Sequence, residues 1–141
     1  SMAAVLDHLY DYQTTRSATD FAEAVRTLTI RQRRRALVVL LTNLRGEDAP
    51  DLLPAIRLLR RSHLVLIANL REASVDALDD TPIGDLPAAL THCAGVAYRE
   101  QRSELMAQLS SAKAITIDEP AGDLPVALAN RYLQIKASGE L

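Results

Sequence analysis

Three short runs of apolar residues, each bounded by polar ones, dominate the hydrophobic pattern of the chain: 36–42, 63–69 and 114–118. They are continuous rather than alternating and rich in valine and isoleucine, as is typical of strands buried on both faces of a parallel sheet. We therefore predict a strand at each run, and the first two runs give the strongest signals.

Apolar residues spaced three and four positions apart predict helices between and around these strands. In the long segment 85–111, Gly95 is a candidate break, and Ser17 or Thr19 is a candidate N-cap for the helix over 20–34. Gly139 is placed to cap the last helix. The predicted helices cover 2–13, 20–34, 50–61, 72–80, 85–111 and the segment lined by Leu124, Leu128, Tyr132 and Ile135, and the apolar stripe of 85–111 is Leu86, Leu90, Cys93, Ala97, Leu105 and Leu109.

An Asp-Leu-Pro motif begins at Asp85 and again at Asp123, with a looser copy at Asp51. A solenoid repeat would explain the recurrence, but the segments between the copies differ in length and pattern. An acidic residue followed by a proline in the first turn is also typical of a helix start, because proline needs no hydrogen-bond acceptor there. We interpret all three copies as helix starts.

The alternation of strands and helices predicts βαβ units with right-handed crossovers, whose helices all lie on one face of the sheet. The N-terminal helices and the C-terminal helix should then cover the opposite face. The predicted fold class is α/β, with a three-stranded parallel sheet flanked by helices.

Composition excludes several classes of protein. The chain has 141 residues, 48% of them hydrophobic and 24% charged, which suits one compact domain. No apolar run approaches the roughly 20 residues of a membrane span, and the single cysteine, Cys93, cannot form an internal disulfide. Glycine-rich dinucleotide and phosphate-binding loops are absent, as is the nucleophile elbow of α/β hydrolases.

Two groups of residues could carry enzyme chemistry. Asp7 and Asp11 flank His8 on a predicted helix, so they could bind a metal or act as acid and base, although a solvated helix face explains them more simply. His92 adjoins Cys93, but neighbours on a helix point about 100° apart, so we interpret Cys93 as a small core residue.

The arginines form a basic cluster, opposed by an acidic one. Nucleic acid could bind the arginines, but no aromatic residue interleaves with them to stack on bases, and cations also stabilise a helix C-terminus. We therefore expect no nucleic-acid partner. The oppositely charged clusters could instead guide docking of a protein partner. The basic cluster is Arg31, Arg33, Arg34, Arg35, Arg57, Arg60 and Arg61, and the acidic one is Glu72, Asp76, Asp79, Asp80 and Asp85.

Three segments, 33–44, 63–72 and 130–139, together resemble a bacterial family catalogued as domain of unknown function 58. The most specific of them is Asn-Arg-Tyr-Leu-x-Ile-Lys, which begins at Asn130. This family is similar to the von Willebrand factor A domain, a Rossmann-like fold, and the chain corresponds to the C-terminal half of that domain. The resemblance implies that residues 1–141 form a single partial domain and a fragment of a longer protein.

The resemblance also implies a degenerate metal site. In von Willebrand A-like domains, an Asp-x-Ser-x-Ser loop, a threonine and an aspartate hold Mg²⁺ at the carboxyl ends of the strands. The threonine corresponds to Thr19 and the aspartate to Asn43, and the loop sequence is absent. We expect no metal, cofactor or catalytic residue in this chain, although the parent protein could hold Mg²⁺. Ordinary roles for these residues are a helix N-cap for Thr19 and a turn at the end of a strand for Asn43.

The function implied by the resemblance is that of a non-enzymatic protein-interaction module. Family members are associated with MoxR-type ATPases in assembly or chaperone-like complexes, and many carry N-terminal membrane helices. We expect a cytoplasmic segment without membrane contact, whose parent protein could be anchored. The alternative is a divalent-metal-dependent hydrolase or ligand-binding enzyme that uses Asp7, His8 or Asp11.

Strand 36–42 lies in the middle of the complete sheet of such domains, so here one of its edges has no partner. An unpaired edge of an apolar strand favours pairing with another chain. We therefore predict a homodimer, formed edge to edge through strand 36–42 or by exchange of the N-terminal helices.

Overall fold

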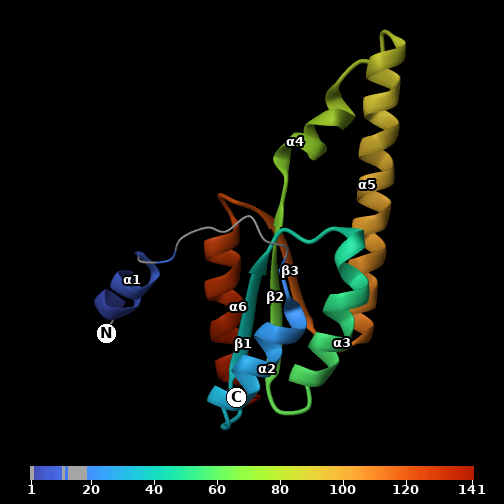
Figure 1. Ribbon diagram of the computed structural model, residues 1–141. Coiled ribbons are helices and arrows are strands. Elements are labelled where there is room, and N and C mark those ends of the chain that lie inside the picture. The colour runs from blue at the N-terminus through green and yellow to red at the C-terminus, as the bar shows by residue number, and fades with distance from the viewer. Residues whose placement is uncertain (1, 11, 13–18) are drawn as a thin grey trace.

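The computed structural model describes residues 2–10, 12 and 19–141, and they include an open, three-stranded, all-parallel sheet with helices on both faces (Figure 1). The strands are β1 (Leu37–Thr42), β2 (Leu64–Arg71) and β3 (Ile115–Pro120), in the order β1-β2-β3. The predicted fold class is confirmed. All three predicted strands form, with ends displaced by one or two residues.

The helical elements are also close to the predicted ones, except that residues 72–80 split into a short α-helix and a 3-10 turn. Helix α5 runs through Gly95 without the candidate break. The elements are α1 (Met2–Tyr10), α2 (Phe21–Arg31), η1 (Gly46–Asp48), α3 (Ala49–Leu59), α4 (Ala73–Asp76), η2 (Ala77–Asp80), α5 (Leu86–Ser111) and α6 (Leu124–Ser138).

The central strand, β2, is the most buried element of the fold. Its register pairs Leu37 of β1 with Leu64, and Leu66 with Ile115 of β3. Every residue from Leu64 to Asn69 is buried, because helices cover both faces of this strand. The continuous apolar run of the sequence follows from this double coverage.

Helices α2, α3 and α5 pack on one face of the sheet, and α6 packs on the other. Both crossover helices therefore lie on the same face, as predicted. The prediction that α2 covers the opposite face is wrong, because Phe21 and Val25 of α2 join the core formed by Leu52 and Ile56 of α3. Helix α1 stands apart from these layers (Figure 1), and its described side chains are exposed.

Helix ends test the interpretation of the Asp-Leu-Pro copies. Asp85 caps α5 as predicted, since its Oδ1 accepts a hydrogen bond from the backbone N–H of Ala88 at 2.8 Å. Asp123 precedes α6 but makes no such bond, and Asp51 lies inside α3, which already begins at Ala49. The helix-start interpretation is therefore wrong for Asp51, and Asp123 does not cap through its side chain.

Two further capping predictions concern α2 and α6. Asp20, not Thr19, caps α2, because its carboxylate accepts the backbone N–H of Glu23 at 2.8 Å. Ser17, the other candidate, lies outside the described residues. Gly139 ends α6 in the left-handed conformation with φ of 74°, as predicted.

Helix α5 is 26 residues long, and only its C-terminal half lies against the sheet. Leu105 and Leu109 are buried as expected, whereas Leu86, Leu90, Cys93 and Ala97 are all exposed. The prediction that Cys93 is a core residue is therefore wrong. In the N-terminal half of α5, Gly95 lies against Leu78 of η2 instead of against the sheet. Among the described residues, no helix is both long and apolar enough to cross a membrane.

Candidate functional site

The carboxyl end of the sheet holds a buried polar side chain that links all three strands. Asn69 of β2 is fully buried, and its Oδ1 accepts the backbone N–H of Leu44, just beyond β1, at 2.8 Å. Its Nδ2 donates to Oδ1 of Asp118 on β3 at 3.2 Å. Because a buried amide without partners would cost stability, these bonds explain how β2 tolerates a polar residue in its core.

Arg102 of α5 extends this chain of contacts to the helix layer. Its side chain is only 7% exposed and forms an ion pair with Asp118 through Nη2, while Nη1 donates to Tyr98 Oη at 3.4 Å. Burial lowers the pKa of Arg102, but the hydrogen bond and negative charge of Asp118 outweigh it, so the pKa is raised. The guanidinium therefore stays charged, and the pair fastens α5 to β3.

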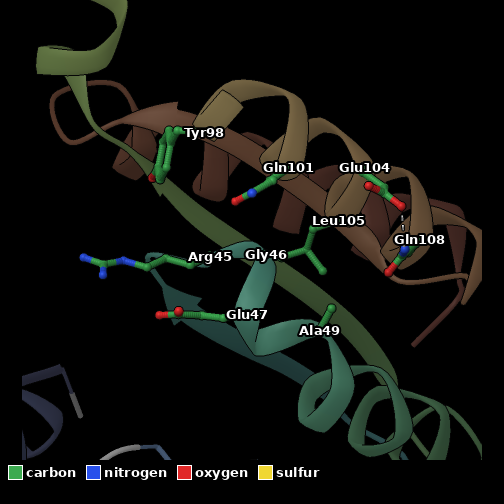
Figure 2. Close-up of a pocket in the computed structure, with 9 residues that line it drawn as sticks. All are labelled: Arg45, Gly46, Glu47, Ala49, Tyr98, Gln101, Glu104, Leu105 and Gln108. Atoms are coloured by element: carbon green, nitrogen blue, oxygen red, sulfur yellow. Dashed lines mark hydrogen bonds between the residues drawn. The ribbon is translucent and has the colours of Figure 1, made fainter. Parts of the chain in front are cut away.

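Two hollows flank Tyr98. The first, of about 510 Å³, lies between α5 and the segment Arg45–Ala49. Figure 2 shows Tyr98, Gln101 and Leu105 on α5 across from that segment. The second, of about 430 Å³, lies between α4, α5 and β3 and includes Arg102 and Asp118. Both open near the carboxyl ends of parallel strands, which is the usual location of ligand sites in α/β sheets.

Several charged groups around the second hollow are engaged by neighbouring side chains. Besides the Arg102–Asp118 pair, Arg71 Nε lies 3.0 Å from Asp76 Oδ2. Glu72 accepts a hydrogen bond from Asn43 at 2.7 Å. These contacts therefore stabilise the carboxyl end of the sheet, and each of these charged side chains already has a partner within the chain.

The two residues implied by the resemblance lie in different surroundings. Asn43 follows β1, is exposed and donates to Glu72. Thr19 lies beside Asp51 and Pro54 in a hollow between the starts of α2 and α3. Among the described residues, no three histidine, cysteine or carboxylate side chains are grouped so that they could hold a metal ion.

The other candidate residues are dispersed. Asp7 and His8 are exposed on α1, and Asp11 lies outside the described residues. Cys93 is exposed on α5. His63 immediately precedes β2 and is 3% exposed, and neither of its ring nitrogens is hydrogen-bonded to another described residue. It lies at the amino end of the strand, away from both hollows.

The basic cluster lies at the amino end of the sheet. Arg31 is the last residue of α2. Arg33, Arg34 and Arg35 occupy the connection from α2 into β1, and Arg61 lies in the connection from α3 into β2. All five are exposed. The acidic cluster follows β2, at the carboxyl end of the sheet, so the two charged clusters lie at opposite ends of the sheet.

Sequence analysis missed the Asn69–Asp118–Arg102 chain. One signal was present, because a single amide interrupts the otherwise apolar run of β2. The partners of Asn69 depend on strand register, which the sequence pattern left open. The chain matches no protein-family model, and neither a curated protein nor a solved structure matches it.

Proposed function

We propose that this chain is a non-enzymatic protein-interaction module whose principal docking element is the outer edge of β1, with which no other described strand pairs. The observation that carries the proposal is the position of β1 at the edge of the sheet, with apolar side chains left exposed. An edge strand offers a row of backbone donors and acceptors on which another strand can pair.

The side chains of β1 alternate between the two faces of the sheet. Val38 and Leu40 pack into the core beneath α2 and α3. On the other face, α6 packs against β3 and β2, and Leu41 remains 64% exposed. Val39 is also exposed. An added strand would therefore gain backbone hydrogen bonds, and its own apolar side chains could cover Val39 and Leu41.

The occupant that we propose for this edge is a second copy of the chain, which gives a homodimer. Two identical apolar edges can pair about a twofold axis, since each supplies the surface that the other needs. Exchange of α1 between copies is the alternative route, favoured by the exposure of Leu6 and Leu9 on that helix.

The proposed biological partner is a MoxR-type ATPase, and the module would act with it in an assembly or chaperone-like complex. This step is supported by the resemblance of segments 33–44, 63–72 and 130–139 to the family of unknown function 58 and thereby to von Willebrand A-like domains. Binding of a purified ATPase of this type, measured by calorimetry with the wild-type chain and with a β1 variant, tests it.

The dimer is tested by Leu41→Lys. At about 1 M salt, which screens contacts between charged surfaces, we expect the wild-type chain to show twice its 15.4 kDa mass in light scattering. The variant should be monomeric there, because lysine places a charge in the apolar contact. Leu133→Lys on α6 is the matched control, since Leu133 is exposed to a similar extent, at 59%. It should leave the dimer intact.

A monomeric wild-type chain at high concentration would refute the dimer. A dimer that survives Leu41→Lys but is lost when residues 2–10 are removed would replace edge pairing with exchange of α1.

A further inference from the structure

Beyond the sheet, the chain forms a projecting arm, which we define as residues 73–97: α4, η2 and the N-terminal half of α5. Figure 1 shows the arm extending past the carboxyl end of the sheet, at the end of the molecule remote from the C-terminus of α2. Within the arm, α5 and η2 approach each other closely at Gly95, where an added Cβ would lie 2.5 Å from Leu78 Cδ1. Glycine thus permits the close approach of α5 to η2.

The outer side of the arm carries an apolar stripe that the described part of the chain leaves exposed. Leu86 is 71% exposed and Leu90 is 62% exposed. Together with Cys93 and Ala97 they repeat at spacings of four, three and four, so they share one face of α5. That face lies opposite Gly95 and Arg102, which are buried. An apolar face at this periodicity is typical of a helix that packs against a partner.

The charge of the arm limits the partners that this stripe can have. Residues 72–98 contain no lysine or arginine. Asp80 and Asp85 are exposed on the arm, and so is Asp76, which lies 3.0 Å from Arg71. Two such arms would repel each other, so pairing of arm with arm is disfavoured. The complementary surface must combine cations with apolar side chains.

The opposite end of the same molecule has that combination. We define the cationic end as the exposed side chains of Arg31, Arg33, Arg34, Arg35, Arg57 and Arg61. Residues 24–46 and 52–71 contain no aspartate or glutamate. Within the part of the chain that the structure describes, none of these arginines forms an ion pair. Ile30 and Leu58 are exposed beside them, at the ends of α2 and α3.

We propose that the arm of one molecule docks on the cationic end of a second copy. The stripe covers Ile30 and Leu58 of that copy, and the arm's exposed carboxylates Asp80 and Asp85 pair with its arginines. Arm and cationic end lie at opposite ends of the sheet, so a molecule cannot satisfy both surfaces by itself. The contact joins two different surfaces and is therefore heterologous, and it repeats from copy to copy into open head-to-tail chains.

This contact uses neither the β1 edge nor α1, and it is tested in the Leu41→Lys background so that edge pairing does not contribute. In this background we expect the average mass in light scattering to rise with concentration at low ionic strength. The rise should be lost at about 1 M salt, where the screening length falls to about 3 Å. If the β1 dimer does not exist, the series gives the same results in the wild-type chain.

Two variants separate the surfaces. Leu86→Ser with Leu90→Ser disables the arm, and Arg33→Glu with Arg34→Glu disables the cationic end. All four side chains are exposed, so both variants should retain the wild-type circular dichroism spectrum. Each alone should weaken self-association at least about tenfold, and a mixture should give a 1:1 complex that grows no further. One intact arm and one intact cationic end remain in that mixture.

Val126→Ser and Arg131→Glu on α6 are the matched controls, and both should associate as the parent does. The proposal is overturned if either double variant alone still forms chains, or if the mixture of the two stays monomeric.

Discussion

At the scale of single residues, the structure depends on a few polar contacts whose partners lie far apart in the sequence. Asn69 joins the end of β1 to Asp118 on β3, and Asp118 joins β3 to Arg102 on α5. Each side chain supplies a hydrogen bond or an opposite charge to the next one, so the carboxyl end of the sheet contains a network in which the buried polar groups have partners. Removing one member would leave another with an unmet charge or hydrogen bond.

Arg102→Met tests this network. Methionine keeps most of the apolar stem but removes the charge, and Asp118 then loses its counter-ion. Because the Asp118 side chain retains 32% exposure, we expect a loss of about 2 kcal/mol in the free energy of unfolding, less than for a fully buried pair. Urea denaturation followed by circular dichroism measures it.

The double variant Arg102→Met with Asp118→Leu is the control for this pair. We expect it to be more stable than the sum of the two single changes predicts, because no unpaired charge remains. Strict additivity would mean that Arg102 and Asp118 contribute independently.

At the scale of elements, α5 shows why a helix can be located from the sequence while its buried face is not. Apolar residues occur on two sides of this helix. Leu86 and Leu90 form the more regular series, yet Gly95, Leu105 and Leu109 face the protein. Periodicity reports which residues share a face, but the choice of face depends on where the neighbouring elements lie.

The strands were predictable because each is a continuous apolar run, and doubly covered β2 has the clearest one. The face of the sheet that α2 covers was not predictable. Its apolar residues Phe21 and Val25 suit either face, and it is the contact with α3 that decides between them. The partners of Asn69 depend on register in the same way. Local pattern therefore predicts elements, while contacts between elements require the assembled fold.

Gly95 gives a prediction for α5 as an element. In a helix interior alanine is favoured over glycine by about 1 kcal/mol, but here the added Cβ meets the end of the Leu78 side chain. We expect Gly95→Ala to raise the free energy of unfolding by about 1 kcal/mol in a Leu78→Ala background and by clearly less in the wild type. Thermal and urea unfolding measure both. Equal gains in the two backgrounds would show that Leu78 does not oppose the substitution.

At the scale of the whole molecule, side chains become more exposed with distance from the sheet. β2 is covered on both faces, whereas the arm and α1 leave large apolar side chains exposed. The regions left uncovered are also those available to partners. A small sheet therefore supports peripheral elements that depend on other chains for burial.

This arrangement predicts the pattern of amide hydrogen exchange in the isolated monomer. Backbone amides open with free energies that follow local burial, so residues 64–69 should exchange only through global unfolding. Residues 86–94 and 2–10 should exchange faster by several orders of magnitude, because few buried contacts hold those helices. Mass spectrometry of the Leu41→Lys variant at about 1 M salt measures this, since edge pairing and charge-driven docking are then both suppressed. Equal protection of residues 86–94 and 64–69 would contradict the assignment of the arm as a separate, weakly held element.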